Sequence, residues 1–403
     1  MKTITITLNT CLQFKLLSLK EVLILSSYED TRLTANEQRI YRLIRNNPYI
    51  SQQELAEAIG LSRPSVANII SGLIRQNIIR GKAYILNETA PLVCIGGANV
   101  DRKLTAKEPL QSGTSNPATS VQTAGGVARN VAENLGRLEN DTALITAAGD
   151  DADWQLINQA TASAANLERI ALIPGATTGS YTAVLGPDGE MALALADMDV
   201  FDEALTAEFL RQHEAYLATA KLLVADLNLP GETVAELIHI ARRRDIPLAI
   251  LAVSVPKMDR LPADLTGVTW LMTNRQESET ALSTTIDSGE AAKQAVRRWQ
   301  DKGAANVIIT DGANGAYHAG HGRTEPAHTP AAAAKSVVDV TGAGDAFAAA
   351  VLHTWLHGAT HDEAIAAGMT NANATLAVPH TVRRDLNAET FSRNTIPKTE
   401  TEA

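Results

Sequence analysis

The chain has 403 residues, and its 35 Lys and Arg against 45 Asp and Glu give a net charge of −10. At roughly 150 residues per domain, this length predicts two or three structural units. A hydrophobic content of 45% with 20% charged residues excludes a disordered chain. Two cysteines are too few for a disulfide framework and fit a reducing, cytoplasmic setting. The acidic average argues against a protein that coats nucleic acid along its whole length.

Residues 1–33 have an apolar character without a recognisable pattern of elements. Polar residues interrupt the apolar ones too often for a membrane span, which needs about 20 mostly apolar residues. Lys15 and Lys20 lie inside the apolar stretch and no small-residue cleavage site follows, so the segment lacks a secretory layout. We expect an N-terminal extension outside the folded domains, and no membrane helix in the later chain.

Residues 34–88 have the pattern of three short helices followed by a small hairpin. Capping-box spacings begin the first two helices, apolar residues recur at helical intervals, and Gly60 ends the second helix. The third helix has Pro64 in its first turn, where proline is tolerated. Helices joined by a Gly-containing turn, with a hairpin at 78–86, predict a winged helix-turn-helix domain. The segment resembles the DNA-binding heads of bacterial regulators.

The charge of this domain differs in sign from that of the rest of the chain. Seven Lys or Arg against three Glu give it +4, which leaves −14 for the remainder. In such a domain the start of the third helix enters the major groove of duplex DNA, while the wing contacts phosphates. Five residues are therefore candidates for DNA binding: Arg63, Ser65 and Asn68 on the helix, and Arg80 and Lys82 on the wing. The alternative is a winged helix that makes protein contacts only.

From residue 91 to about 388, short apolar runs alternate with amphipathic stretches of helical length. The runs are short enough for buried parallel strands: 92–95, 142–145, 222–225, 248–251 and 307–310. Such alternation predicts a doubly wound α/β sheet with helices on both faces. Ligands of such sheets bind at the carboxyl ends of the strands. Residues 389–403 are expected to form a tail.

A first polar patch follows the opening strand. It contains Asn99 and Asp101, and further along the chain the Gly125-Gly126 pair precedes Asn130 at a helix start. Paired glycines let the backbone approach a ligand closely, and amide and carboxylate side chains suit a polyhydroxylated substrate. An ordinary Asx turn is the alternative interpretation of the first two residues.

A second patch, residues 339–348, has a small-residue turn that opens a long apolar helix. The backbone amides of Gly342, Ala343 and Gly344, with the positive end of the helix, would form an anion site. A carboxylate beside such a site repels phosphate, so Asp345 is better explained as a base that removes a hydroxyl proton as a phosphoryl group arrives. Helix capping is the alternative for Asp345.

Other phosphate and metal motifs are missing from the sequence. Gly81-Lys82 lacks the upstream glycine and the following Ser or Thr of a Walker A motif. The turn at 342–347 lacks the third glycine of a dinucleotide fingerprint, which disfavours NAD. His353, His357 and His361 are spaced by four, but a glycine interrupts them, so helix-end histidines are favoured over a metal site.

These motifs, in this order, resemble the PfkB or ribokinase family of carbohydrate kinases over about three quarters of the chain. The strongest match is the run from Asp339 to Asp345, Asp-Val-Thr-Gly-Ala-Gly-Asp, which is similar to a family signature. The resemblance implies that Asp345 is the catalytic base, that residues 342–344 form the anion hole, and that ATP donates the phosphoryl group. It implies substrate ligands at five positions: Asn99, Asp101, Gly125, Gly126 and Asn130.

The resemblance also assigns nucleotide and cation sites. Asn274 and Glu277 fall on a motif that organises Mg²⁺ and phosphate, chiefly through water, with a solvated helix start as the alternative. The nucleotide loop and adenine pocket are implied at four positions: Thr310, Gly312, Gly315 and Asn371. Asp339 and Thr341 match a loop that binds a monovalent cation, K⁺, in many members.

Within the family, segments such as 125–135 and 224–228, with Lys257 as a substrate ligand, resemble bacterial pseudouridine kinases. One departure concerns the substrate, because Leu251-Ala252 stands where those enzymes have Asp-Pro. We expect phosphorylation of the primary hydroxyl of a ribose-bearing substrate, with pseudouridine, another nucleoside and a free pentose left open. A small β lid around 180–197, often shared in a homodimer, is implied. The alternative function is a transcription regulator that uses a kinase-like domain as a sugar or nucleoside sensor.

Overall fold

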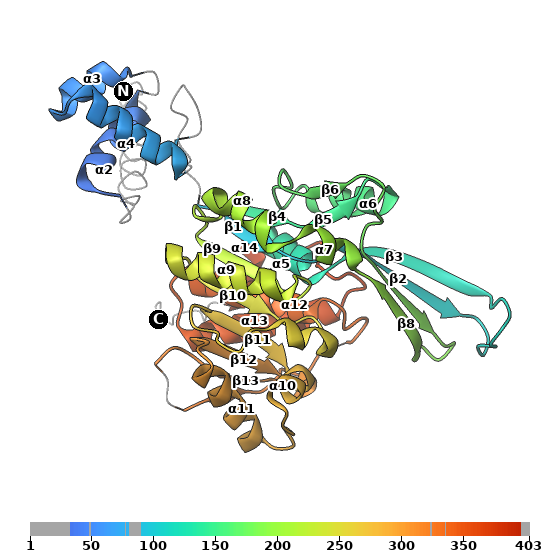
Figure 1. Cartoon of the computed structure of the whole chain (residues 1–403). Coiled ribbons are helices and arrows are strands. Elements are labelled where there is room, and N and C mark those ends of the chain that lie inside the picture. The colour runs from blue at the N-terminus through green and yellow to red at the C-terminus, as the bar shows by residue number, and fades with distance from the viewer. Residues whose placement is uncertain are drawn as a thin grey trace, which may run out of the picture. The chain divides into compact units, whose positions relative to one another are not determined.

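The computed structural model describes residues 33–47, 50–76, 78–79, 90–322, 325–334 and 336–395. The chain divides into two compact units between residues 88 and 89 (Figure 1). Each unit has a hydrophobic core of its own. The expected N-terminal extension lies almost entirely outside the described residues, as do Arg80 and Lys82 of the expected wing.

The small unit begins with three helices: α2 (Ala35–Asn46), α3 (Gln52–Ile59) and α4 (Arg63–Arg75). Both expected capping boxes are present, because Thr34 and Ser51 each accept from the third helical amide while the glutamate there bonds back. Apolar side chains from all three helices are buried together. The helical part of the predicted domain is confirmed, whereas the hairpin expected at 78–86 lies mostly outside the described residues.

An eight-stranded mixed sheet forms the centre of the large unit (Figure 1). Six strands are parallel: β1 (Leu92–Ile95), β4 (Thr142–Ile145), β9 (Leu222–Asp226), β10 (Leu248–Leu251), β11 (Trp270–Asn274) and β12 (Asn306–Thr310). Two strands extend one edge in antiparallel pairing: β13 (Ala316–Ala319) and β14 (Ala327–Thr329). The order β14-β13-β12-β11-β10-β9-β1-β4 confirms the predicted α/β sheet.

Helices cover both faces of this sheet, and neighbouring residues of one strand pack on opposite sides. Val93 and Ile95 of β1 belong to one core, whereas Leu92 and Cys94 belong to the other. The first face is covered by α7 (Asp199–Ala204), α8 (Ala207–Leu217), α9 (Gly231–Arg244), α10 (Arg275–Leu282) and α11 (Gly289–Asp301). The second is covered by α5 (Val127–Arg137), α6 (Ala152–Thr161), α12 (Ala343–Leu356) and α13 (His361–Leu376). Burial on both faces explains the continuous apolar runs.

A four-stranded sheet, which we call the lid, projects from the large unit (Figure 1). Its order is β3 (Ala118–Gly125), β2 (Asn99–Ala106), β7 (Ser180–Leu185) and β8 (Met191–Asp197). Asn99 at the start of β2 pairs with Gly125 at the end of β3, so the base of the lid joins both parts of the first polar patch. The small β lid that the sequence predicts is confirmed.

Short elements complete the large unit. β5 (Ala147–Gly149) pairs with β6 (Ala171–Ile173), and two 3₁₀ helices, η1 (Val255–Arg260) and η2 (Gly312–Asn314), follow β10 and β12. None of the helices that the structure describes is long and apolar enough to cross a membrane.

The C-terminal segment differs from the tail expected at 389–403. Its first part forms helix α14 (Ala388–Thr395). Phe391 is buried in a cluster with Leu138, Ala350 and other apolar side chains. An eight-residue helix has little stability of its own, so packing of this aromatic ring holds it against the body. The first part of the expected tail therefore forms a helix, and its boundary stays a prediction.

Candidate active site

The turn before α12 places Asp345 in the first helical turn. Gly342 has φ 82°, and a Cβ there would lie 2.2 Å from the Thr381 carbonyl oxygen, so this position requires glycine. Gly344, by contrast, has open space on its Cβ side. The amides of Gly344 and Asp345 occupy the second and third helical positions, which have no acceptor within the helix and carry the positive end of the dipole. These features suit the anion site that the sequence predicts at 342–344.

Asp345 faces Asn130 of α5. The Asn130 Nδ2 atom donates to the Asp345 Oδ2 atom at 2.7 Å. Burial raises the pKa of Asp345 to about 7. A carboxylate with a pKa near neutrality is matched to proton transfer at physiological pH. Helix capping does not account for Asp345, because Gly342 is the N-cap of α12 and no side chain caps this helix.

The first polar patch gathers at the base of the lid. The Asn99 Nδ2 atom donates to the Asp101 Oδ1 atom at 2.7 Å, and both residues lie within β2, which excludes the Asx turn. A Cβ on Gly125 would lie 2.2 Å from the Asp101 Oδ2 atom. At Gly126, where φ is 96°, a Cβ would lie 2.4 Å from the Gly97 carbonyl oxygen. The two glycines therefore let β3 and α5 approach the Asp101 carboxylate and the loop after β1.

Asp226, a buried carboxylate absent from the sequence-based candidates, joins three segments of this region. It accepts hydrogen bonds from the backbone amides of Gly97 at 3.0 Å, Ala128 at 2.8 Å and Asn228 at 2.8 Å. Burial raises the pKa of Asp226, while these N–H donors lower it. The available signal was an acidic residue at the end of an apolar strand, since carboxylates are rarely buried without such partners.

Lys257, predicted as a substrate ligand, lies on η1 after β10. Its ammonium group contacts the Asn228 Oδ1 atom, at the exit of β9. Burial lowers the pKa of Lys257, and the Asp226 charge opposes that shift. The structure thus places Lys257 at the carboxyl ends of the strands, where ligands of α/β sheets bind. Substrate binding by Lys257 stays a prediction.

The residues predicted for the nucleotide lie at the carboxyl ends of β11 and β12. Asn274 and Thr310 pair in register, and the Thr310 hydroxyl donates to the Thr273 carbonyl oxygen at 3.4 Å. Asn274 caps α10, and Glu277 bonds back to the Asn274 amide at 2.7 Å. Glu277 is 4% exposed and burial raises its pKa, so this helix start is not simply solvated.

The loop after β12 contains the two predicted glycines. Gly312 opens η2 with φ 53° and has open space on its Cβ side. Gly315 has φ 95°, and a Cβ there would lie 2.1 Å from the Thr329 carbonyl oxygen, so the close approach of β13 and β14 requires glycine. A contact of this loop with the nucleotide stays a prediction.

Asn371 of α13, predicted to line the adenine pocket, is buried in contacts with protein groups. Its Nδ2 atom donates to the Ala346 carbonyl oxygen at 2.9 Å. An Nη2 atom of Arg383 donates to the Asn371 Oδ1 atom at 3.0 Å. These bonds join α13 to α12 and to the segment before α14. The adenine role of Asn371 stays a prediction, because its amide already has partners here.

The loop predicted to bind K⁺ contacts a lysine of the lid. The Lys103 ammonium group, on β2, forms an ion pair with Asp339 and donates to the Thr341 hydroxyl at 3.1 Å. The Thr341 amide and hydroxyl donate to the other Asp339 oxygen at 2.9 and 2.7 Å. A K⁺ ion at these side chains would have to displace the ammonium group. The two side chains do not fit K⁺ while Lys103 is in place.

The three candidate DNA-binding residues within the described part of the small unit are exposed. Arg63, Ser65 and Asn68 lie at the start of α4, while Val66 and Ile70 of the same helix are buried. The Ser62 hydroxyl caps the helix by accepting from the Ser65 amide at 3.3 Å. The predicted polar face of the third helix is therefore available to a ligand.

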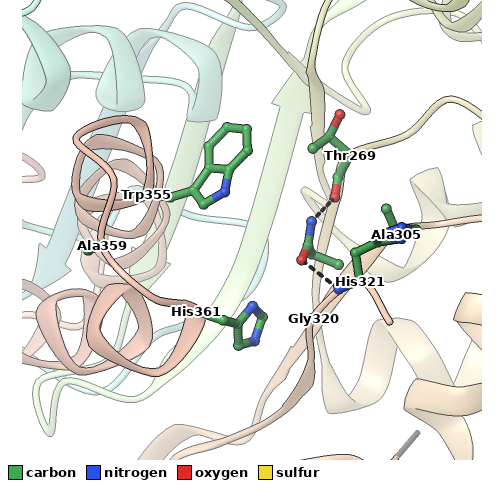
Figure 2. Close-up of a pocket in the computed structure, with 8 residues that line it drawn as sticks. Thr269, Ala305, Gly320, His321, Trp355, Ala359 and His361 are labelled. Carbon is green, nitrogen blue, oxygen red and sulfur yellow. Dashed lines mark hydrogen bonds between the residues drawn. The ribbon is translucent and has the colours of Figure 1, made fainter. Parts of the chain in front are cut away.

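A cavity of about 480 Å³ lies at the amino ends of β11 and β12, away from the edge that carries Asn274 and Thr310 (Figure 2). Asn306 bonds to two of the other lining residues, since its Nδ2 atom donates to the Thr269 carbonyl oxygen at 2.7 Å and its Oδ1 atom accepts from the His321 amide at 3.0 Å. His361, one of the three spaced histidines, lines this cavity at the start of α13. The cavity contains none of the predicted site residues.

Residues 89–384 match the family model described as pfkB family carbohydrate kinase. The chain belongs to the pfkB family of carbohydrate kinases. Residues 33–80 match a second model, described as winged helix-turn-helix DNA-binding. The family and the order of the two domains that the sequence predicts are confirmed, and the large unit is a carbohydrate or nucleoside kinase domain of this family.

Several curated proteins are similar to this pfkB-family chain. The pseudouridine kinase of Escherichia coli strain K12 is 31% identical over 306 residues, which cover 75% of this chain and 95% of that protein. The uncharacterized sugar kinase YeiI of the same organism is 30% identical, with 80% and 88% covered. The guanosine-inosine kinase of Exiguobacterium acetylicum is 28% identical, with 71% and 94% covered.

Solved structures agree on the fold. A carbohydrate kinase from Agrobacterium tumefaciens has 29% identity and a TM-score of 0.65, and the match covers 77% of this chain and 98% of that one. Arabidopsis thaliana ribokinase, solved with ribose and ATP, has 20% identity and a TM-score of 0.68, with 76% and 99% covered. The ribokinase-like fold expected from the sequence is thus confirmed.

Proposed function

We propose that this pfkB-family kinase transfers a phosphoryl group from ATP to the primary hydroxyl of pseudouridine, giving pseudouridine 5′-phosphate. The observation that carries the proposal is the 2.7 Å contact between Asn130 and Asp345, which holds a base at the start of α12. Similarity to a pseudouridine kinase over 95% of that protein supports the substrate. Leu251-Ala252 and the similarity to a guanosine-inosine kinase keep another nucleoside or a free pentose as alternatives.

The residues support a direct transfer. The Asp345 carboxylate takes the proton of the substrate hydroxyl as the phosphoryl group arrives. Asn99, Asp101 and Asn130 would hydrogen-bond substrate hydroxyls at the base of the lid. The amides of the turn before α12 stabilise the charge that develops on the transferred group. Closure of the lid would exclude water and so suppress hydrolysis of ATP.

The carboxyl edge of the sheet also fits ATP with Mg²⁺. The open space beside Gly344 leaves room for a phosphoryl group. Glu277 and Asn274 would hold Mg²⁺ through water, because in phosphoryl-transfer sites this ion keeps several waters and binds one or two carboxylates besides the phosphates. Bound Mg²⁺ neutralises charge on the phosphates. The Lys103 ammonium group would compete with K⁺ for Asp339 and Thr341.

A panel of acceptors tests the proposal. The protein is incubated with ATP, Mg²⁺ and, separately, pseudouridine, uridine, inosine, guanosine and ribose, and the product is identified by mass spectrometry and phosphorus NMR. We expect pseudouridine to have the highest kcat/KM. A higher kcat/KM for another acceptor would show that pseudouridine is not the preferred substrate, while the proposed kinase activity would stand. Turnover by Asp345→Asn at the rate of the exposed control Asp301→Asn would overturn the mechanism.

We also propose that two copies of the chain associate through their lids. Met191, Leu193 and Leu195 alternate along the edge strand β8, and each is more than half exposed. An apolar edge strand is a liability in a monomer, and a second lid would cover it. We expect light scattering to give the mass of a dimer, and Leu193→Asp to give a monomer. The control is Leu172→Asp, at an exposed residue of β6. A monomeric wild type would overturn this.

A second candidate function is regulation of transcription, with the kinase domain as a sugar or nucleoside sensor. The exposed Arg63, Ser65 and Asn68 favour duplex DNA as a partner. Sites are selected from random duplexes, and binding is measured against salt. Arg63→Ala is expected to weaken binding more than Arg75→Ala, which removes the same charge from the exposed end of α4. Ligand-dependent DNA binding without any phosphorylated product would favour the sensor. Equal effects of both variants would contradict groove binding.

A further inference from the structure

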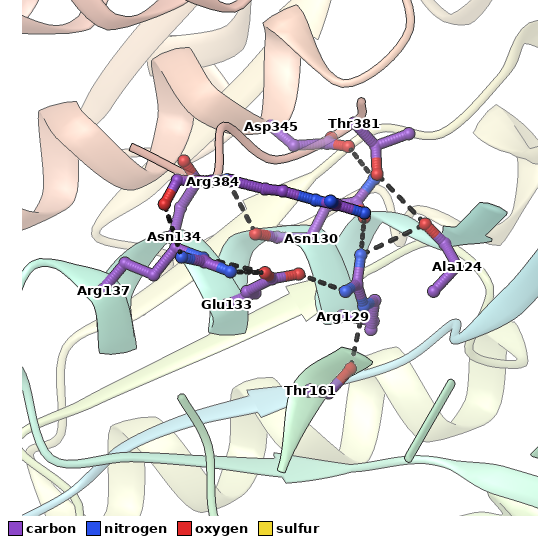
Figure 3. Close-up of polar contacts among 10 residues, drawn as sticks. All are labelled: Ala124, Arg129, Asn130, Glu133, Asn134, Arg137, Thr161, Asp345, Thr381 and Arg384. Carbon is purple, nitrogen blue, oxygen red and sulfur yellow. Dashed lines mark hydrogen bonds and ion pairs between the residues drawn. The ribbon is translucent and has the colours of Figure 1, made fainter. Parts of the chain in front are cut away.

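Arg129 of α5 is the centre of a polar network between α5 and α12 (Figure 3). The whole residue is 2% exposed. The Nε atom donates to the Thr161 hydroxyl at 2.9 Å, an Nη1 atom donates to the Ala124 carbonyl oxygen at 3.1 Å, and the group forms an ion pair with Glu133. A buried charge is costly unless it is paired, so this arrangement needs a physical reason.

The next residue in the chain supplies that reason. The Arg129 Nη1 atom also donates to the Asn130 Oδ1 atom at 2.9 Å, and the Nδ2 atom of the same amide donates to Asp345 at 2.7 Å (Figure 3). A guanidinium group has donors and no acceptor, so it can bond only to the amide oxygen. With that oxygen engaged, the NH₂ group of Asn130 faces the carboxylate. Without Arg129, the amide is free to rotate and to turn its oxygen toward Asp345.

We propose that Arg129 is a positioning residue for phosphoryl transfer, which holds the Asn130 amide in the orientation that donates to the Asp345 carboxylate. The inference rests on the proposed function, because it concerns the same base. Arg129 acts through Asn130, and its remaining contacts keep the guanidinium in place. The Ala124 carbonyl oxygen that it binds also accepts from the Thr381 hydroxyl at 3.0 Å, next to the turn of Gly342. Arg129 is therefore linked to the turn of Gly342 through Ala124 and Thr381.

The charge of Arg129 adds to this effect. Besides burial, four groups set the pKa of Asp345. Asn130 and Arg129 of α5 lower it, whereas Asp226 of β9 and Asp101 of β2 raise it. The charges that face Arg129 itself are Glu133, Arg137, Asp101 and Asp345. Loss of the arginine removes its positive charge and also the bond that fixes the orientation of the Asn130 amide. We expect the pKa of Asp345 to rise above about 7, by about one unit.

The variants are chosen so that a loss of folding cannot be mistaken for the effect. Arg129→Met combined with Glu133→Met removes the ion pair without leaving a lone buried carboxylate. Arg137→Met is the matched control, because Arg137 donates to the same Glu133 at 2.8 Å from a less buried position. Arg129→Lys keeps the positive charge but loses the several N–H donors of the planar guanidinium group. Thermal unfolding confirms that each variant is folded.

The dependence of kcat/KM on pH is the first measurement, with the best acceptor of the panel. We expect the acid limb of the double variant to move up by about one pH unit, with kcat/KM about tenfold lower near pH 6.5 and recovering toward pH 9. Arg137→Met should keep the wild-type limb, and Arg129→Lys should lie between. An unmoved limb in the folded double variant would overturn the proposal, as would an equal loss at every pH.

A second measurement needs no substrate. Infrared difference spectra between each protein and its Asp345→Asn counterpart follow the protonation of this carboxyl group directly. A shift in the double variant but not in Arg137→Met supports the positioning role. If that shift occurs while no acceptor of the panel is phosphorylated, the proposed function fails and the inference about Arg129 stands. Identical titrations in all variants would overturn it.

Discussion

Two carboxylates near the carboxyl edge of the sheet, Asp226 and Asp345, differ in what holds them. Asp226 accepts from backbone amides of three segments and from the Asn228 side chain, whereas Asp345 is held by the side-chain amide of Asn130. Burial raises the pKa of both. Backbone amides cannot move away without unfolding their segments, so Asp226 holds these three segments together. A side-chain amide can yield to a substrate hydroxyl, so Asp345 can exchange partners and take a proton.

Asp345→Asn should have the largest effect. The amide cannot accept the hydroxyl proton, so we expect kcat to fall at least about 10³-fold, with an unchanged circular dichroism spectrum. Initial rates of product formation from ATP check this. A decrease of less than about tenfold would remove Asp345 from the role of base and break the comparison.

Asp226→Asn should act on stability. Its NH₂ group would face N–H donors that now bond to a carboxylate, and we expect unfolding to cost about 3 kcal/mol less than in the wild type. Urea unfolding followed by fluorescence measures this, with the exposed Asp301→Asn as control. Full stability together with lost activity would mean that Asp226, too, takes part in the reaction.

The pH dependence of stability sharpens the contrast further. The folded-state pKa of Asp345, about 7, lies above its ordinary value of 3.8. The stability linked to its proton is therefore present below about pH 4 and lost as the pH rises through about 7. We expect Asp345→Asn to melt about 3 °C above the wild type at pH 8, with the difference shrinking toward pH 4. Calorimetry that finds a constant difference would contradict this.

A third carboxylate, Asp339, accepts from the Thr341 amide and forms an ion pair with the Lys103 ammonium group, and replacing this lysine should have the smallest effect. We expect Lys103→Met to make kcat rise about threefold with added K⁺, because a partly exposed ion pair is worth about 1 kcal/mol or less. Lys107→Met, on an exposed lysine after β2, is the control. Equal activation of wild type and variant would show that Lys103 does not compete with K⁺.

The parts of the fold that depend on local pattern were predictable. Strands such as Leu92–Ile95 are apolar because both faces of the sheet are covered, and the Thr34 and Ser51 capping boxes need only a spacing of three. The motif that ends in Asp345 was recognisable from its residues, of which Gly342 meets a steric requirement. Capping and strand patterns act within a few residues of the chain, and a motif can be read from its residues alone.

The parts that depend on distant contacts were not predictable. Arg129 looks like a polar residue on an amphipathic helix, and only the fold buries it against Glu133 and Asn130. Asp226 looks in the sequence like any polar residue that ends a strand, and only the fold brings its three backbone donors to it. Phe391 lies in a segment that is too short and polar to predict a helix. The stability of α14 comes from tertiary packing.

The separation along the chain of the residues that meet at Asp345 has a consequence for biosynthesis. Asn130 precedes Asp345 by 215 residues, and Lys103 precedes Asp339 by 236. A ribosome therefore completes the lid and α5 long before it makes α12. Contacts of such long range form late in folding. A chain interrupted before α12 would lack both the proposed base and the proposed anion turn, so we expect incomplete translation products to transfer no phosphoryl group.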